Sequence, residues 1–515
     1  MPIHEHNHQD FRGMTALWKP THIFRFLFVS LLLSSSAIST GCSSGPAHIA
    51  PLVVEDHSQA LVHWAKRGVR DAILINFDTH DDFRWIPDDK IEKLRNIYHR
   101  RDWKAMSEAD SGGDRGLYDV GNWIYAGARL GIFKEVYWVI PFNDFAQKDP
   151  GAVLRWFIQN CGFPPEDVKT FTLRNNQFRG FFHGIPVTIC GMEALPSIGE
   201  PVLLTVDADF YPTYFENYRT AYPRALRTTL GALFNVGYRI QDMVVSYSIN
   251  GEYLQPQLRW VGDAVAMILR KPEMIKEDKP PEQLLLLQQL DNAYRAENAV
   301  EMLSLAKNAL PSQPPSVLVY KAYAHMLRGD LDKAYEAATA SCTLDRMYCT
   351  ALPYLATKLW EKGEYPQAER FFLNGYLLDP LMTNGYFQYA CDLRSIGKLR
   401  AAIEYYRKDV TVNGSFRGNM LIFDTFLMLG DQEHAVDALK TAISGLEYNS
   451  YVKVTNPPMA DAVYRAIDFC EEKRLKELSV RLKNSPAVQG MFRDYPRQFK
   501  RSKRSTVRDF RMERQ

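Results

Sequence analysis

Hydrophobic residues follow a strand-and-helix pattern in the first half of the chain. Between residues 51 and 272, short apolar runs rich in valine, isoleucine and aromatic residues alternate with stretches of helical spacing. Alternation of this kind favours an α/β fold with a mostly parallel sheet and helices on both faces. The predicted strands lie at residues 72–78, 135–141, 184–190, 201–209 and 242–249, and the clearest helices at 118–131 and 223–237.

The second half of the chain, residues 284–490, has a helical pattern throughout and repeats itself. Four glycines recur every 33 or 34 residues, and each is followed five residues later by an alanine: Gly329 and Ala334, Gly363 and Ala368, Gly397 and Ala402, Gly430 and Ala435. This spacing of a turn glycine and a small packing residue resembles the tetratricopeptide repeat, whose paired helices stack into an all-α solenoid. The resemblance implies a groove that binds a protein partner.

A linker is expected before the helical region, and an irregular repeat unit is expected at each of its ends. A charged, proline-bearing segment at residues 273–283 is predicted to be a linker between the two halves. Helices at about 282–310 and 460–483 are expected to add a degenerate unit at each end, because repeat arrays need caps.

The N-terminal segment 1–41 looks like a targeting signal. Basic residues precede the apolar run FLFVSLLL, and small residues follow up to Cys42. The pattern resembles a bacterial lipoprotein signal, although Ser39 stands where that family usually has leucine. The resemblance implies lipidation at Cys42 and anchoring in the cell envelope, with outer-membrane sorting favoured because Ser43 is not aspartate. An uncleaved anchor is the alternative.

Composition excludes few partners by itself. The formal net charge is +2, with 24% charged and 46% hydrophobic residues. These values are typical of a globular protein and not of a highly charged protein that covers a polyanion. The tail 491–515 is basic, but for an exported chain a solvated or headgroup-facing tail is favoured over nucleic-acid binding. Two cysteines, Cys342 and Cys349, lie close enough in the sequence for a disulfide to be conceivable.

Metal-type ligands gather after two of the predicted strands. Asp78, His80 and Asp82 follow one apolar run, and Asp207 and Asp209 follow another. Ligands bind at the carboxyl ends of parallel strands, where these residues are expected to lie. Upstream, His57 stands in the string Asp-His-Ser at the start of a predicted helix. The structural alternative is an aspartate-rich loop that caps the following helices.

The order of these motifs, D-H-S, D-x-H-x-D and D-x-D, resembles the arginase/deacetylase (ureohydrolase) superfamily, whose domain is a three-layer α/β fold. The resemblance implies that His57 and Asp82 bind one ion, that His80 and Asp209 bind a second, and that Asp78 and Asp207 bridge both. Two divalent ions are therefore expected, and the excess of carboxylates favours Mn²⁺ over Fe²⁺ or Zn²⁺. Such a pair can share a water molecule and lower its pKa.

Other positions are candidates for catalysis or substrate contact. Glu252 lies roughly where arginases place a guanidinium-gripping glutamate, and His183 stands in an HG-x-P string like that of a proton-shuttling histidine. The alternative for His183 is an ordinary hairpin histidine. Asn122 and Trp123 could line the pocket, with core packing as the alternative for Trp123. Asp81 is expected to point away from the ligands if the chain stays extended, and so to face solvent or to lie behind the ligands.

The sequence thus predicts an envelope-attached binuclear metal hydrolase that cleaves a non-peptide C–N bond, amide or amidine, in a small-molecule substrate. The alternative is a non-catalytic tetratricopeptide scaffold lipoprotein whose arginase-like domain is degenerate. Fold resemblance alone does not decide between these hypotheses.

Overall fold

The computed structural model describes residues 50–110, 116–249, 253–277, 279–309, 314–378, 386–413, 415–448, 457–485, 488–489 and 491–492. The predicted signal segment with Cys42, the candidate Glu252 and nearly all of the basic tail lie outside these residues.

The first half of the chain forms an eight-stranded sheet with the order β1-β8-β7-β2-β3-β6-β5-β4. Neighbouring strands from β1 to β6 in this order are parallel, and only β6–β5 and β5–β4 pair antiparallel. The five predicted strands are β2, β3, β6, β7 and β8. β1, β4 and β5 were not predicted, because β1 and β4 are only three residues long and β5 lacks a continuous apolar run. The strands are β1 Leu52–Val54, β2 Ala72–Phe77, β3 Phe133–Val139, β4 Thr172–Arg174, β5 Gln177–Phe182, β6 Ile185–Cys190, β7 Val202–Asp207 and β8 Ile240–Ser246.

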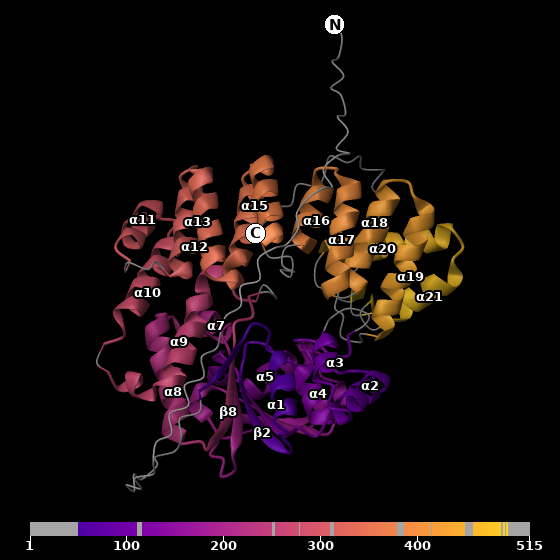
Figure 1. Cartoon of the computed structure of the whole chain (residues 1–515). Coiled ribbons are helices and arrows are strands. Elements are labelled where there is room, and N and C mark those ends of the chain that lie inside the picture. Colours follow the sequence, from indigo (N-terminus) through magenta and orange to yellow (C-terminus); the bar gives the residue numbers. More distant parts are fainter. Residues whose placement is uncertain are drawn as a thin grey trace, which may run out of the picture. The chain divides into compact units, whose positions relative to one another are not determined.

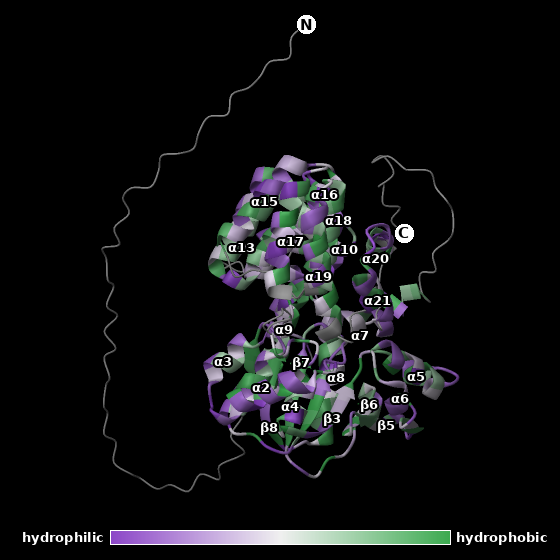
Figure 2. Cartoon of the chain, turned by 90° about the vertical axis from the view of Figure 1, so that its right-hand side faces the viewer, coloured by the Kyte–Doolittle hydropathy of each residue, from purple (hydrophilic) through white to green (hydrophobic). Residues whose placement is uncertain are grey.

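Both faces of the sheet are buried under helices. In β2, Ile73, Ile75 and Phe77 pack in one hydrophobic core, and Leu74 packs in the other. Because successive side chains of a strand point to opposite faces, the two cores lie on the two sides of the sheet. Figure 2 shows the hydrophobic residues of the strands enclosed by helices of mixed hydropathy.

Of the helices in the first half of the chain, six line the core around Leu74 and three line the core around Phe77. The first set is α1 Gln59–Lys66, α2 Asp88–His99, α3 Trp103–Glu108, α4 Trp123–Arg129, α5 Pro150–Asn160 and α6 Pro165–Val168; the second is α7 Phe210–Tyr218, α8 Tyr222–Val236 and α9 Arg259–Arg270. The helix predicted from residue 118 begins only at Trp123. Short 3₁₀ helices are η1 Asp144–Ala146, η2 Met192–Ala194, η3 Pro256–Leu258, η4 Pro272–Lys276 and η5 Arg346–Thr350.

The second half is an array of helix pairs that follow one another in chain order (Figure 1). Partners α12 with α13, α14 with α15, α16 with α17 and α18 with α19 make extensive contacts. The helices are α10 Glu282–Arg295, α11 Ala299–Lys307, α12 Pro315–Leu327, α13 Leu331–Leu344, α14 Ala351–Glu361, α15 Tyr365–Leu378, α16 Tyr386–Ser395, α17 Leu399–Asn413, α18 Ser415–Met428, α19 Gln432–Tyr448, α20 Pro457–Glu472 and α21 Lys476–Asn484.

The repeated glycines end the first helix of each of these four pairs. Gly329, Gly363, Gly397 and Gly430 have φ between 75° and 81°. The amide of the residue after each glycine donates to a carbonyl five residues earlier, at 2.9 to 3.0 Å, as in a Schellman motif. The four repeated alanines are 0 to 1% exposed. The 34-residue pattern therefore produces a tetratricopeptide-like array.

The two outer pairs use the same turn without glycine. Glu297, between α10 and α11, has φ of 49°, and Arg474, between α20 and α21, has φ of 59°. In both turns the following amide again donates to a carbonyl five residues earlier, at 2.8 Å. These are the degenerate end units, and their missing glycines explain why the sequence period fades there.

The two halves of the sequence share one continuous core. A single hydrophobic cluster runs from Ile73 to Met491, and the described residues belong to one compact unit. Polar contacts cross the junction as well: Arg295 donates to the Tyr222 hydroxyl at 3.0 Å, and Trp260 donates to the Tyr320 hydroxyl at 3.3 Å.

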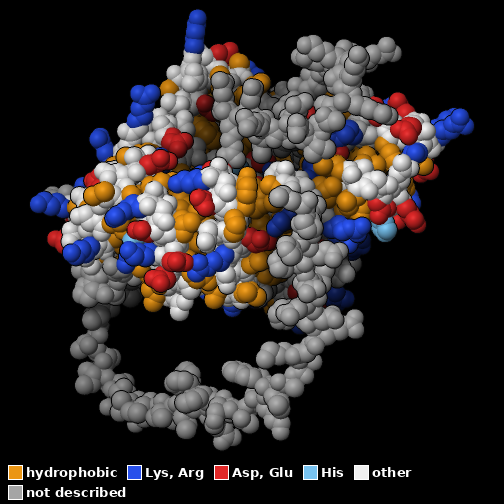
Figure 3. All heavy atoms as spheres, turned by 90° about the horizontal axis from the view of Figure 1, so that it is seen from above, with side chains coloured by type: hydrophobic (Ala, Val, Ile, Leu, Met, Phe, Trp, Pro, Cys, Tyr) orange, Lys and Arg blue, Asp and Glu red, His pale blue; other side chains and the backbone are white. Residues whose placement is uncertain are grey.

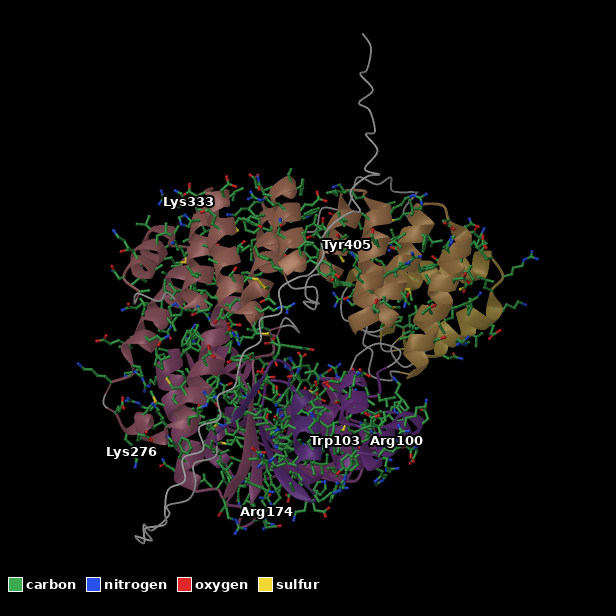
Figure 4. The ribbon with its side chains drawn as sticks, viewed as in Figure 1. Arg100, Trp103, Arg174, Lys276, Lys333 and Tyr405 are labelled. Atoms are coloured by element: carbon green, nitrogen blue, oxygen red, sulfur yellow. A yellow bond between two sulfur atoms is a disulfide. The ribbon has the colours of Figure 1, made fainter. Side chains whose placement is uncertain are left out.

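Part of the segment predicted to be a linker is packed. Its η4 helix contacts α8 and α9, and Arg227 of α8 donates a hydrogen bond to the carbonyl of Glu277. Lys276, labelled in Figure 4, lies at the end of η4, whereas the labelled Lys333 lies on α13 of the array. The segment therefore separates two sequence patterns, but the hydrophobic core continues across it.

The described surface mixes both signs of charge. On the face shown in Figure 3, basic and acidic side chains are interspersed with hydrophobic ones. Within the described ranges, no helix combines the length and the apolar character needed to span a membrane.

Candidate metal centre

Two adjacent parallel strands bring the predicted carboxylates together. β2 pairs with β7 in a register that places Phe77 opposite Val206, so Asp78 and Asp207 come next along the two chains. The backbone of Asp78 is held on the other side by β3, because its amide donates to Val139 at 3.3 Å and its carbonyl accepts from the Trp138 indole at 3.0 Å. The sheet therefore fixes both bridging candidates.

One group of possible ligands contains His57, Asp78 and Asp82, with one ligand atom of each lying within 4.8 Å of the others. His57 Nδ1 lies 3.0 Å from Asp78 Oδ2 and 3.2 Å from Asp82 Oδ2. The same nitrogen lies 3.4 Å from Asp207 Oδ2. Four of the six predicted ligands thus meet around one imidazole nitrogen.

A second group contains Asp78, His80 and Asp209. His80 Nδ1 lies 2.9 Å from Asp209 Oδ2 and 3.8 Å from Asp78 Oδ1. Asp78 belongs to both groups and offers a different oxygen to each histidine. The structure therefore brings all six predicted ligand side chains into one cluster, with Asp78 in the bridging position.

The cluster contains buried polar atoms that the described protein atoms leave without hydrogen bonds. These atoms are His57 Nδ1 and both carboxylate oxygens of Asp209. Their near neighbours, Asp78 Oδ2 at 3.0 Å from His57 Nδ1 and His80 Nδ1 at 2.9 Å from Asp209 Oδ2, do not lie in hydrogen-bonding directions. His57 is fully buried, and Asp209 is 4% exposed. Buried polar atoms without partners are costly, so a bound cation would account for this arrangement. Imidazole and carboxylate donors suit Mn²⁺, Fe²⁺ and Zn²⁺, and the residues therefore fit a metal ion.

The electrostatics of the cluster also favour a cation. Burial first, and then the charges of Asp82 and Asp209, raise the pKa of Asp78 well above its usual range. Burial and the Asp209 charge raise the pKa of Asp207 to about 7. Burial alone would lower the pKa of His57, but the carboxylates of Asp78 and Asp82 outweigh it and raise this pKa well above normal. Close buried carboxylates repel one another, and a divalent ion would relieve that repulsion.

Three residues outside the ligand motifs hold the ligands in place, and sequence reasoning missed two of them, Thr205 and Ser248. Thr205, inside β7, hydrogen-bonds His57 Nε2, which leaves Nδ1 directed into the cluster. Ser248 donates to Asp207 Oδ2 at 2.6 Å, and the Trp123 indole donates to Asp82 Oδ2 at 2.8 Å. Such partners orient ligands and tune their basicity. None belongs to a motif, and the only signal for Thr205 is a polar residue in the middle of an apolar strand.

Replacing Thr205 tests this support. We expect Thr205→Val to weaken Mn²⁺ binding roughly 10-fold to 100-fold, because His57 would lose the partner that fixes its ring. Calorimetric titration with Mn²⁺ measures this change. Thr188→Val is the matched control, since Thr188 is also a buried strand threonine but lies on β6. Equal affinities of the two variants would contradict the role assigned to Thr205.

Neither of the other described candidates, Asn122 and His183, belongs to the two ligand groups. The Asn122 side chain accepts a hydrogen bond from the Asp119 amide at 2.7 Å, and its neighbour Trp123 contacts Asp82 instead. His183 lies exposed in the turn between β5 and β6, where its backbone amide donates to Asp167 at 2.8 Å and its ring contacts Tyr125. Glu252 is not among the described residues.

The expectation that the chain stays extended past Asp81 is wrong. Asp82 has φ of 49°, so the backbone turns after β2 and brings both Asp78 and Asp82 to His57. Asp81 is only 8% exposed, and burial raises its pKa to about 6. A carboxylate this buried does not face solvent, so of the two expected roles only the one behind the ligands is left as an interpretation.

Comparisons with known proteins identify no family for this chain. No protein-family model and no curated protein matches it. Solved structures similar to part of it include MamA (AMB-1), at 15% identity over 32% of this chain and 91% of that one, with a TM-score of 0.24. MamA (MSR-1) has 16% identity over 32% and 97%, with a TM-score of 0.23. A Rap conjugation gene regulator of plasmid pLS20, solved with the Phr* peptide, has 12% identity over 56% and 97%, with a TM-score of 0.23.

Proposed function

We propose that this protein is a binuclear metal hydrolase that cleaves a non-peptide C–N bond, and that its tetratricopeptide-like array recruits a protein partner. The observation that carries the proposal is the pair of buried His/Asp groups that share Asp78. The order of the ligand motifs and their place at the ends of parallel strands also support a three-layer arginase/deacetylase-like domain.

Each of two ions would have its own ligands, and two carboxylates would be shared between them. His57 and Asp82 would hold one ion, His80 and Asp209 the other, and Asp78 and Asp207 would contact both. Mn²⁺ is favoured over Fe²⁺ or Zn²⁺ because carboxylates predominate. When bound, such a pair supplies Lewis acidity that activates water for attack on an amide or amidine carbon. Thr205, Ser248 and Trp123 keep the ligands in place for that chemistry.

A second candidate function is a non-catalytic scaffold. Its support is that His183, the histidine that the sequence offers as a proton shuttle, lies exposed in a surface hairpin. In both cases we propose that Cys42 anchors the protein by a lipid in the bacterial envelope. The disulfide between Cys342 and Cys349 supports an oxidising compartment, since disulfides persist in exported proteins.

Metal-dependent hydrolysis separates the two candidates. The fragment from residue 43 to the end, reconstituted with Mn²⁺, is expected to hydrolyse small N-acyl or amidine substrates and to lose this activity when treated with a chelator. Asp78→Asn should be inactive, because the shared ligand is lost. Release of amine or ammonia is the measurement. Metal binding without turnover on either substrate class would favour the scaffold.

A further inference from the structure

Arg259 is a buried cation at the junction between the sheet domain and the helical array. It is the first residue of α9, and its side chain is 10% exposed. Its guanidinium pairs with Asp345 from the segment after α13. The same guanidinium lies over two aromatic rings, 4.1 Å from the Tyr247 centroid and 5.1 Å from that of Tyr348. Because a buried charge needs its partners, this contact depends on both halves of the chain.

On the sheet side, the contact leads directly to a candidate metal ligand. Tyr247 follows β8, and its hydroxyl donates to Asp263 of α9. A Cβ at Gly262 would lie 2.6 Å from the Tyr247 ring, so the backbone of α9 packs directly on this ring and a side chain at Gly262 would clash with it. The next residue, Ser248, donates to Asp207 Oδ2 at 2.6 Å.

The backbone of Ser248 is held as firmly as its side chain. Its φ is 53°, its amide donates to the Glu55 carbonyl at 2.8 Å, and its carbonyl accepts from Leu254 at 3.1 Å. Ser248 is bonded directly to Tyr247 along the chain. A shift of Tyr247 would therefore strain the contacts that hold Ser248, including its hydrogen bond to Asp207.

On the array side, a disulfide closes the segment that holds Arg259. Cys342 and Cys349 are bonded, with their Cα atoms 4.3 Å apart. Asp345 and Tyr348, which contact the guanidinium, lie between these cysteines. The Asp345 carboxylate also accepts from the Met347 amide at 3.0 Å, which fixes its orientation. Closing a short loop restricts the positions that its residues can reach.

We propose that Arg259 is a positioning residue that couples the helical array to the metal centre. It holds Tyr247 and Ser248, and thereby the carboxylate of Asp207, while the segment closed by Cys342 and Cys349 holds Arg259. The inference rests on the proposed metal function for its consequence, but not for the coupling itself. Reduction of the disulfide to two thiols by a dithiol reductant, which is itself oxidised to a disulfide, then alters metal affinity through this contact.

A matched arginine provides the control. Arg370 in α15 pairs with Asp332 at 2.7 Å and lies 4.3 Å from the Tyr335 centroid, so it makes the same two kinds of contact entirely within the array. Arg259→Met removes one ion pair and two cation–π contacts, and Arg370→Met removes one ion pair and one cation–π contact. Only the first interrupts the path to Asp207.

The coupling is tested by amide hydrogen exchange of the full chain. In Arg259→Met we expect faster exchange in the peptides spanning residues 243–249 and 203–209, with Arg259→Lys closer to the parent. Arg370→Met should leave both peptides unchanged, and reduction of the parent disulfide should accelerate the 243–249 peptide. If 243–249 and 203–209 exchange in Arg259→Met as in the parent, or if Arg370→Met accelerates them equally, the coupling is wrong.

Mn²⁺ titration then separates the coupling from the metal function. We expect Arg259→Met to weaken Mn²⁺ binding roughly threefold to tenfold, less than loss of a residue that contacts a ligand directly. Arg370→Met should bind as the parent does. A parent that binds no Mn²⁺ would refute the proposed function, and the exchange result would still decide the coupling. Unchanged Mn²⁺ affinity in Arg259→Met, with faster exchange, would overturn the claim that the contact positions Asp207 for metal.

Discussion

Asp78→Asn is expected to remove most of the bound metal, leaving between none and about one ion per chain where the parent holds about two. Asp78 belongs to both groups of ligands, and its two oxygens face His57 and His80 separately. The amide of asparagine is neutral, so the two cations would face each other with less negative charge between them. Metal analysis of the purified protein after reconstitution with Mn²⁺, Fe²⁺ and Zn²⁺ in turn measures the change.

Two further variants make this result specific. Asp82→Ala should spare about one ion, because Asp82 belongs to only one of the groups. Asp242→Asn is the matched control: Asp242 is also a buried aspartate, but it lies near the start of β8 and pairs with His63 at 2.9 Å and Arg67 at 3.1 Å. A parent protein that holds no more metal than Asp78→Asn would show that the cluster is not a metal centre.

Trp260→Ala should have the largest effect on stability, a loss of about 3–5 kcal/mol in the free energy of unfolding. Trp260 is 2% exposed, and its ring packs edge-on against Tyr222 at 5.4 Å. Its indole donates to the hydroxyl of Tyr320, which in turn donates to Asp291 at 3.4 Å. The substitution therefore leaves a cavity and a buried polar group with one partner fewer, at the junction of the two halves.

Urea unfolding, monitored by circular dichroism and by tryptophan fluorescence, measures this loss. Trp156→Ala is the control, because Trp156 is 67% exposed and its replacement should change stability by no more than about 0.5 kcal/mol. If the two halves unfold together, both probes should report the same transition in the parent. A Trp260→Ala protein as stable as the control would contradict the shared core.

The helical array was predictable because its signals are local. A glycine with positive φ and a hydrogen bond five residues back involve a few consecutive residues, so the turn at Gly329 is visible in the sequence around it. The turns at Glu297 and Arg474 have the same shape but no glycine, and there the period in the sequence is lost. The strands β4 and β5 escaped prediction for a related reason, since they form an antiparallel edge with exposed positions and lack a continuous apolar run.

The sequence by itself determined the ligand types and the ends of the strands that carry them. Apolar runs that stop at Asp78 and Asp207 place carboxylates at the carboxyl ends of β2 and β7, because a parallel sheet collects those ends at one edge. Only the tertiary structure decided that the two strands are neighbours, that the chain turns at Asp82, and that Thr205 and Ser248 hold the ligands. These features depend on contacts between residues up to 148 positions apart, and a local pattern carries no information about such pairs. The contact of Arg259 with Asp345 was hidden for the same reason, since each residue has its partner in the other half of the chain.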